Sequence, residues 1–499
     1  MGDRCEVLDW AASGAMALTG MPDGTPVASP APALAMLAQV SAEFARVTAI
    51  MGNQVRADPA DLIAGRAALA GFTRGGRASA GGSSFLLRSA DGWCAVTLSR
   101  PDDVAAVPAI AGLLGVDGTR GTAIATLAQA RSALTLAALG RPAEDLAAAA
   151  QLVGVPAAAL PAGARPPGAG EVSFAGTGEA SLAGTATWPP WRATRIAAPL
   201  TGAGLAGARL ADTVVADLSS MWAGPLCARL LGLAGAKVIK VESPARPDGA
   251  RSGNREFFDW LHAGHRSLAV DFGTRAGRTV LASLLEVADV VIESSRPRAL
   301  AAMAAAPGMI PHPPGQVWLS ITGYGRSMPE RVAFGDDAAV AGGLVGWAGD
   351  GRAGDGRAGD ESAGPVFCAD AIADPLTGAC GALAVALSRS AGGGELIDLP
   401  MRDVAAAFAA AAPDHGPHDH GPPDHGPHDH GPHDHGPHDH GPHDILPGGW
   451  VSCPRLHRVQ AVLPPRRPAA AAGTAAHAAE LGADTGAVLA WLAGRRAAC

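Results

Sequence analysis

The sequence of 499 residues lacks the features that mark membrane-spanning, secreted or nucleic-acid-binding proteins. Its apolar stretches are broken by Gly, Arg or Asp before they reach the roughly 20 residues that a membrane span requires. A net charge of -8 gives no broad attraction for nucleic acid or anionic lipid, and the first residues do not resemble a secretory signal. We therefore expect a cytoplasmic protein with neither nucleic acid nor a membrane as a partner.

Two further signatures are missing, that of a cysteine framework and that of a dinucleotide site. The seven cysteines form no C-x-x-C pair, which is typical of reduced thiols that pack in an interior. Glu242 stands where a dinucleotide fold would place its ribose-binding carboxylate, but the preceding turn has no G-x-G-x-x-G. That turn reads Ser219-Ser220-Met221-Trp222-Ala223-Gly224-Pro225. The sequence thus predicts no metal site and no tightly bound NAD or FAD.

What the chain does contain is a change of composition along its length. A chain of this length usually folds around more than one hydrophobic core. The Gly- and Pro-rich stretch near 161–204 predicts a boundary between two domains. The repeat of Asp, His, Gly and Pro has too few apolar side chains to fold, so we expect disorder there. The predicted units are a small mixed α/β domain at 1–190, a linker at 191–210, a large domain at 211–412, the disordered repeat at 413–446, and a C-terminal segment packed on the large domain at 447–499.

Strand and helix patterns alternate through the predicted large domain. VVADLS at 214–219 and KVIKVES at 237–243 are buried-strand patterns, and the helical stretch between them ends near Gly235. The alternation continues beyond them, which is typical of a parallel sheet covered on both faces. We therefore predict an α/β fold with a doubly wound parallel sheet, a Rossmann-like large domain and a smaller mixed α/β domain. In the smaller domain, apolar spacing predicts helices near 32–50 and 58–71, and Asp91-Gly92 predicts a hairpin turn.

Four segments, in order, resemble the CoA-transferases of family III, the CaiB/BaiF type. VVADLSSMWAGPLCARLLGLAGAKVIKVESP resembles the opening of that family, and GHRSLAVDF, ADVVIESSRPRAL and VWLSITGYGRSMP resemble three motifs that follow it. The resemblance implies a homodimer that moves coenzyme A from an acyl-CoA thioester to a carboxylic acid. In the family a small domain follows the catalytic segment. Here residues 1–190 resemble that domain, so we predict a rearranged or partly duplicated domain order.

The resemblance places the nucleophilic aspartate of the family at Asp374, within PVFCADAIADPLTGACGALAVAL. Asp370 is the nearest competing carboxylate. Asp374 followed by Pro375 is also an ordinary pair of N-cap and first helical residue, so capping of the next helix is the simpler alternative. A carboxylate suits the implied chemistry, because it attacks a thioester, forms a mixed anhydride and then carries CoA as an aspartyl thioester.

Other positions near the predicted strand ends match the CoA-binding positions of the family. Arg266 is the best candidate for a phosphate contact, with a solvated charge as its alternative role, and His265 stands where the family commonly has Lys. The CoA thioester is expected as a substrate, with no tightly bound cofactor. The predicted CoA-binding residues are Ser220, Met221, Trp222, Ala223, Ser243, His265, Arg266, Ser294 and Ser295.

Two other functions stay open on the sequence alone. Acyl-CoA racemases of the same family use a histidine within a G-H-D pattern, whereas this chain reads Gly335-Asp336-Asp337, which favours transfer over proton exchange. The second alternative is a non-catalytic homologue that uses its HDHGP repeat, because imidazoles at such density bind Ni²⁺, Zn²⁺ or Cu²⁺.

Overall fold

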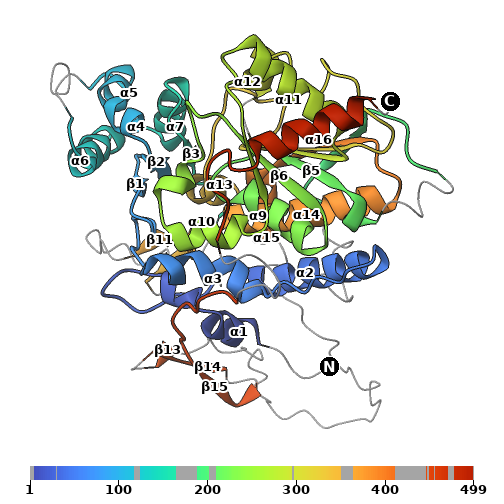
Figure 1. The fold of residues 1–499 in the computed structure, drawn as a ribbon. Coiled ribbons are helices and arrows are strands. Elements are labelled where there is room, and N and C mark those ends of the chain that lie inside the picture. The colour runs from blue at the N-terminus through green and yellow to red at the C-terminus, as the bar shows by residue number, and fades with distance from the viewer. Residues whose placement is uncertain are drawn as a thin grey trace, which may run out of the picture.

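The structure is a computed structural model of the chain (Figure 1). It describes residues 5–29, 31–116, 124–164, 188–201, 209–294, 297–349, 363–410, 445–446, 449–453, 456–469 and 477–497. The predicted disorder of the His-rich repeat and the position of Ser295 lie outside the described residues.

Helices and strands alternate along most of the chain. The α-helices are α1 (Glu6–Ala12), α2 (Ala33–Ile50), α3 (Pro59–Ala70), α4 (Pro101–Ala105), α5 (Val107–Leu113), α6 (Leu127–Ala138), α7 (Ala143–Leu152), α9 (Ala223–Leu233), α10 (Arg255–His262), α11 (Arg275–Val287), α12 (Pro297–Ala302), α13 (Gly335–Ala341), α14 (Ala373–Ser390), α15 (Met401–Ala409) and α16 (Thr485–Ala497). The strands are β1 (Ser84–Arg88), β2 (Trp93–Thr97), β3 (Ala157–Ala159), β4 (Arg192–Arg195), β5 (Val214–Asp217), β6 (Lys237–Glu242), β7 (Arg266–Ala269), β8 (Val290–Glu293), β9 (Val317–Thr322), β10 (Gly346–Ala348), β11 (Gly364–Val366), β12 (Glu395–Pro400), β13 (Ile445–Leu446), β14 (Trp450–Cys453) and β15 (Arg458–Ala461).

A seven-stranded sheet forms the centre of the molecule, with the strand order β4-β12-β9-β8-β5-β6-β7. Every neighbouring pair is parallel except β4 and β12, which are antiparallel. The chain runs outward from β5 to β7 and then returns to β8 on the other side of β5, so the predicted doubly wound α/β fold is confirmed. Open sheets of this kind bind ligands at the carboxyl ends of the strands where the order reverses, here β5 and β8.

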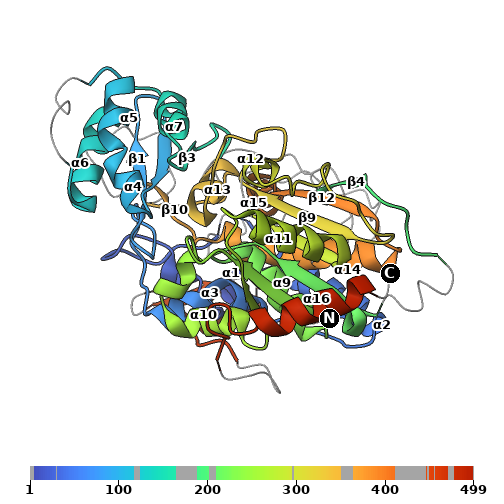
Figure 2. The same ribbon diagram turned by 45° about the horizontal axis from the view of Figure 1, so that its top comes forward.

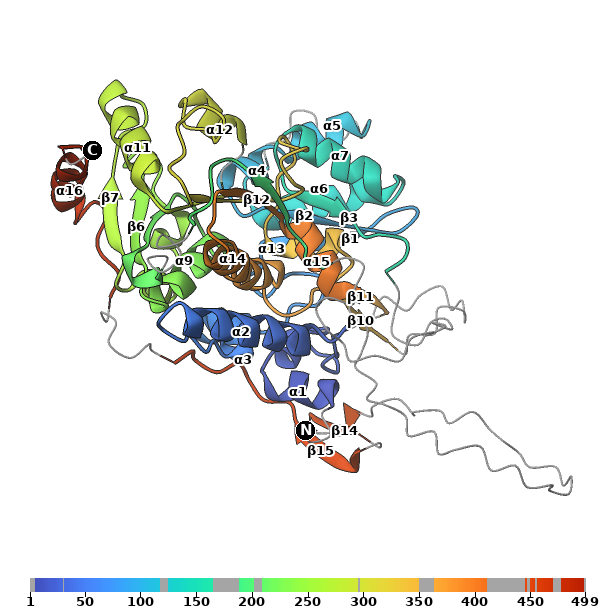
Figure 3. The same cartoon turned by 90° about the vertical axis from the view of Figure 1, so that its right-hand side faces the viewer.

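Helices cover both faces of this sheet (Figure 3). On one face α9 and α14 lie on the strands, and α2 packs across α14 from outside. On the other face α11 packs against the sheet, with α16 against α11 and β7. The alternation of side chains along β5 serves both layers, because Val215 belongs to the core under α9 whereas Val214 and Ala216 belong to the core under α11.

A smaller unit stands beside the sheet (Figure 2). Its antiparallel strands β1, β2 and β3 are covered by α5, α6 and α7 through a separate apolar core. The hairpin predicted around Asp91-Gly92 is confirmed, since β1 and β2 pair from Ser84 with Thr97 to Arg88 with Trp93. On the other face of the hairpin, Leu86 contacts the large unit in a cluster that includes Val340 of α13.

The structure differs from two of the predicted boundaries. Residues 1–190 do not form one small domain, because α2 and α3 pack on α14 and share the main core, while the separate small core begins at β1. The predicted linker at 191–210 contains β4, which forms the antiparallel edge of the large sheet. Apolar spacing in a helix shows that one face is buried, but it does not show which unit buries it.

The longest N-terminal helix, α2, has the length and apolar composition of a membrane span. Half of it is buried inside the structure, and the side chains of Leu37, Val40 and Phe44 lie in the main core against α14 and its neighbours. We therefore interpret α2 as a core helix of the large unit.

Candidate active site

Four carboxyl groups gather where the first turns of α13 and α14 meet. Asp336 and Asp337 lie in the first turn of α13, Asp370 lies in the loop before α14, and Asp374 lies in the first turn of α14. Asp336 Oδ1 accepts a hydrogen bond from the Ala371 N–H at 3.1 Å, which ties the loop to α13. Four acidic side chains in one buried region repel one another unless they are protonated or paired.

The loop before α14 is held in a strained shape. Ala369 and Ala371 have left-handed φ angles of 54° and 43°, a conformation that residues with a Cβ seldom adopt. The Ala369 N–H donates to Thr19 Oγ1 at 2.9 Å, so a residue from the N-terminal segment anchors the loop. Strained backbone that is fixed from two sides is typical of a segment that positions a functional group.

The structure corrects the capping role predicted for Asp374. Helix α14 begins at Ala373 with Ile372 as its N-cap, and no side chain caps this end. Asp374 is therefore the second residue of the helix, and its carboxyl group lies near the backbone N–H of Ala223 at the start of α9, which lowers its pKa. This contact joins two predicted site residues from separate motifs. The simpler alternative, a carboxylate that only begins its own helix, does not describe this side chain.

Burial raises the pKa of Asp374 to about 7, an effect that the positive charge of Arg66 and the N–H of Ala223 oppose and that the neighbouring Asp336 reinforces. The side chain nevertheless keeps some exposure. A carboxyl group that is reachable, that titrates near neutrality and that faces a helix N-terminus has the properties of a nucleophile or an acid-base group.

The competing carboxyl group, Asp370, has a different setting. Its Oδ1 accepts from Arg66 Nη1 at 3.0 Å, and its side chain is 1% exposed. Burial raises its pKa to about 6 against the opposing charge of Arg66. Asp370 is therefore paired and enclosed, whereas Asp374 is largely buried but keeps part of its surface exposed.

The two carboxyl groups on α13 are held by the small unit. Ser84 Oγ donates to Asp336 Oδ2 at 2.8 Å, and Thr97 Oγ1 donates to Asp337 Oδ1 at 2.9 Å. Burial raises the pKa of both groups, that of Asp337 to about 8. The β1–β2 hairpin thus completes the wall of the site next to Asp374.

Gly335 makes the close approach of α13 to Asp374 possible. A Cβ added at this position would lie 2.3 Å from Asp374 Oδ2 and 2.4 Å from the carbonyl oxygen of Ala371. We expect Gly335→Ala to lower the free energy of unfolding by about 1–3 kcal/mol in urea titrations, because the backbone oxygen cannot move aside freely. Gly112→Ala is the matched control, since nothing lies within 4 Å of its added Cβ. Equal stability of both variants would contradict the close contact.

The structure brings together some of the predicted CoA-binding residues at the carboxyl ends of β5 and β8. The Ser220 N–H donates to Ser294 Oγ at 3.2 Å, and both serines are exposed. Met221 is 39% exposed, whereas Trp222 is 2% exposed and packs edge-on against Phe257 with ring centroids 5.4 Å apart. Ser220, Met221 and Ser294 are thus accessible to a ligand, whereas the buried Trp222 anchors this stretch of chain through its packing on Phe257.

The remaining predicted CoA-binding residues lie farther along the sheet. Ser243 follows β6 and is 9% exposed, while Arg266 is exposed and begins β7. His265 precedes β7, and burial together with the charge of Lys240 lowers its pKa to about 3. A neutral His265 brings no positive charge to a phosphate. His265 and Arg266 thus lie at the amino end of β7, away from the strand ends that hold Ser220 and Ser294.

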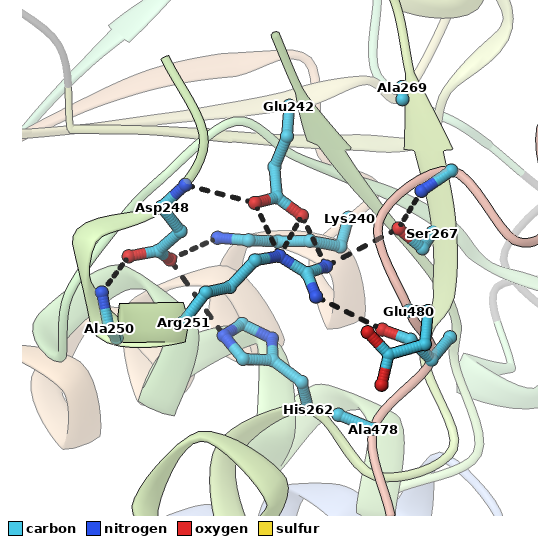
Figure 4. A network of polar contacts seen from close by, with 12 residues as sticks. Lys240, Glu242, Asp248, Ala250, Arg251, His262, Ser267, Ala269, Ala478 and Glu480 are labelled. Atoms are coloured by element: carbon cyan, nitrogen blue, oxygen red, sulfur yellow. Dashed lines mark hydrogen bonds and ion pairs between the residues drawn. The ribbon is translucent and has the colours of Figure 1, made fainter. Parts of the chain in front are cut away.

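A buried network behind the strand ends fixes the loop after β5 (Figure 4). Lys240 Nζ donates to Asp248 Oδ2 at 2.8 Å and to the carbonyl oxygen of Ser219. Asp248 Oδ1 in turn accepts from the Met221 N–H at 3.0 Å. Met221 has a φ of 73°, so these bonds hold a strained residue just before α9. Sequence patterns did not predict this network. Its one signal in the sequence is the lysine inside the apolar pattern KVIKVE.

Glu242 is part of the same network (Figure 4). Its two carboxylate oxygens accept from Arg251 at 2.6–3.1 Å, and its side chain is 3% exposed. A carboxylate that is enclosed and paired in this way is not available to a ribose, which agrees with the missing glycine signature.

The large unit matches a known protein family. Residues 210–453 match the family model of "CoA-transferase family III". Among curated relatives, succinyl-CoA:mesaconate CoA-transferase of Haloarcula hispanica is 35% identical over 127 residues, which cover 23% of this chain and 32% of the relative. Succinyl-CoA--D-citramalate CoA-transferase of Chloroflexus aurantiacus is 30% identical over 145 residues, which cover 27% of this chain and 36% of the relative.

Among solved structures, a CAIB/BAIF family protein from Brucella suis is 28% identical, with 40% of this chain and 54% of that chain covered and a TM-score of 0.33. The chain spans about a third of the length of the two curated relatives. The family match covers residues 210–453, just under half of the chain, and the relatives that align within this chain bear the names of CoA-transferases.

Proposed function

We propose that this chain is a CoA-transferase in which Asp374 carries CoA between two carboxylic acids. The observation that supports this most strongly is the setting of the Asp374 carboxyl group. It is partly exposed, it lies beside the carboxyl ends of β5 and β8, and it lies near the backbone N–H of the first residue of α9. The curated relatives of this chain bear the names of CoA-transferases.

The proposed reaction begins when an oxygen of ionised Asp374 attacks the carbonyl carbon of the donor thioester. The CoA thiolate leaves, and a mixed anhydride remains between Asp374 and the donor acyl group. The thiolate then attacks the Asp374 carbonyl carbon, which releases the donor as a carboxylate and leaves an aspartyl-CoA thioester. The acceptor carboxylate repeats these steps in reverse order and departs as a new thioester, so no net proton is taken up.

The chain supplies stabilisation for the negative charge that develops in these steps. The Ala223 N–H at the start of α9 points at the reacting carboxyl group, where a helix N-terminus favours an oxyanion. Ser220 and Ser294 present exposed groups at the strand ends and are proposed CoA contacts. A homodimer and a cytoplasmic location stay predictions from the sequence.

The substrates are proposed by analogy with the relatives, whose names include succinyl-CoA, mesaconate and D-citramalate. The test is to incubate the full chain with succinyl-CoA and either acid and to follow new acyl-CoA species by liquid chromatography and mass spectrometry. Formation of a new thioester is expected. Exchange of the α-proton of a 2-methylacyl-CoA in D₂O without any transfer would favour the racemase alternative instead. Absence of CoA binding would favour a non-catalytic homologue.

The rate of aspartyl-CoA formation is expected to rise with pH. Asp374 attacks only when ionised, and burial raises its pKa to about 7, so the rate should rise about tenfold between pH 5 and pH 6 and level off above about pH 8. The measurement is the single-turnover rate with succinyl-CoA from pH 5 to pH 9. Enzyme held at each pH and then assayed at pH 8 controls for inactivation. A flat profile would contradict an Asp374 that titrates near neutrality.

A further inference from the structure

The active site contains a cation that comes from outside the matched family region. Arg66 lies on α3 in the N-terminal segment, whereas the family match begins at residue 210. The charged groups that act most strongly on Asp374 are Arg66, Asp336 and Asp370, and of these Arg66 alone is positive. Arg66 therefore sets the charge balance of the carboxyl cluster.

The Arg66 side chain is held at the site by aromatic rings. Its guanidinium carbon lies 5.1 Å from the ring centroid of Trp222, 5.6 Å from that of Phe257 and 5.3 Å from that of Phe72. Such cation–π contacts fix the position of a guanidinium while leaving its N–H groups free to bind. Trp222 directly precedes Ala223, so the same stretch of chain positions Arg66 and the backbone N–H that faces Asp374.

The guanidinium has binding capacity beyond its pairing with Asp370. Within the described residues its hydrogen bond is the one from Nη1 to Asp370 Oδ1, and the side chain is 25% exposed. A guanidinium carries five N–H donors in a fork that fits a carboxylate. Arg66 is thus oriented by Asp370 and retains donors for a ligand that enters next to Asp374.

An incoming acceptor acid needs such a cation. In the proposed reaction the acceptor arrives as a carboxylate, and it approaches a region that already holds Asp336 and Asp370 close to Asp374. Repulsion between like charges in a partly buried site opposes that approach. A single positive group at the site lowers the repulsion and aligns the attacking oxygen at the same time.

We infer that Arg66 binds the carboxylate of the acceptor acid beside the aspartyl-CoA thioester on Asp374. The inference rests on the proposed function. In the step that Arg66 serves, an acceptor oxygen attacks the Asp374 carbonyl carbon, the bond from this carbon to the CoA sulfur breaks, and the thiolate takes the electron pair. Arg66 holds the anion throughout and neither gains nor loses a proton. The N-terminal segment thereby contributes a substrate-binding residue to the large unit.

The test separates the two half-reactions at about pH 8.5, where Asp374 is ionised. With succinyl-CoA alone, Arg66→Gln should still form the Asp374 adduct, but more slowly than the wild type, because the departing succinate carboxylate passes through the same contact in reverse and because loss of the Arg66 charge raises the pKa of Asp374 further. With mesaconate as acceptor, the KM for mesaconate should rise about 10- to 100-fold, as expected for a lost hydrogen bond between charged groups. Arg66→Lys should restore part of this loss. The control Arg131→Gln removes another arginine of the N-terminal segment that stacks on a ring, that of Phe85, and should leave both steps unchanged.

The outcomes distinguish the inference from the function on which it rests. An unchanged KM for mesaconate in Arg66→Gln would overturn the role of Arg66 even while the wild type forms its adduct and transfers CoA. No adduct in the wild type would overturn the proposed function itself. Should Arg66→Gln fold poorly because Asp370 is left unpaired, the double variant with Asp370→Asn removes both charges. The raised KM for mesaconate is expected in that variant as well, and a normal KM would overturn the role of Arg66.

Discussion

Replacing Asp374 with alanine is expected to lower the rate of CoA transfer by about 10⁴-fold or more, because in the proposed mechanism this carboxyl group forms the covalent link to CoA. The carboxyl group lies at the start of α14, and its partner is the Ala223 N–H of α9 rather than its own helix end. The fold should survive the change, since the removed group does not cap a helix. Steady-state transfer from succinyl-CoA to mesaconate measures the effect, with circular dichroism as the check on folding.

The control for this variant is Asp145→Ala, which removes an exposed carboxylate on α7, far from the carboxyl cluster in sequence. Its transfer rate should equal that of the wild type within about twofold. Asp370→Asn decides between the two candidate nucleophiles. Loss of the covalent adduct in Asp370→Asn together with its persistence in Asp374→Ala would assign the nucleophile to Asp370 and contradict the proposal.

Replacing Lys240 with methionine is expected to lower the free energy of unfolding by about 3–5 kcal/mol, since it removes one partner of a buried ion pair. Lys240 is 1% exposed and lies 2.8 Å from Asp248 and 3.8 Å from Asp217 through its Nζ. Methionine fills similar volume but leaves both carboxylates without their cation. Urea titration followed by circular dichroism measures the change in the free energy of unfolding.

The control for Lys240 lies on the same strand. Lys237 is exposed at the start of β6, so Lys237→Met should change the free energy of unfolding by no more than about 0.5 kcal/mol. The loss in Lys240→Met should also release Met221 from its strained conformation, because Asp248 accepts from its N–H. A change below about 1 kcal/mol for Lys240→Met would show that the network does not hold this loop.

The local elements could be predicted because their signals are local. The helix after β5, the hairpin at Asp91-Gly92 and the alternating strands follow from spacing within some ten residues. The boundary at 190 was wrong because α2 and α3 have the apolar stripe of any packed helix, and the partner that buries it, α14, lies more than 300 residues away. Spacing within a helix carries no information about such a distant partner.

The site was predictable only in part for the same reason. Motif order singled out Asp374 and Ala223, which the structure brings close together, but it did not predict the contact between them. The capping role of Asp374 was wrong because α14 starts two residues earlier than that role requires, at Ala373 instead of Pro375, after strained backbone that sequence patterns do not show. Arg66 lies in an ordinary helical stretch and became a site residue only through the packing of α3.

The proposed mechanism requires that CoA becomes attached to Asp374. The most direct measurement is the intact mass of the wild-type chain after incubation with succinyl-CoA, followed by borohydride reduction, proteolysis and sequencing of the peptide that spans 363–389. We expect one CoA per chain before reduction, and homoserine in place of aspartate at position 374 afterwards. An adduct on another residue, or transfer of CoA without any covalent species in the wild type, would contradict the claim.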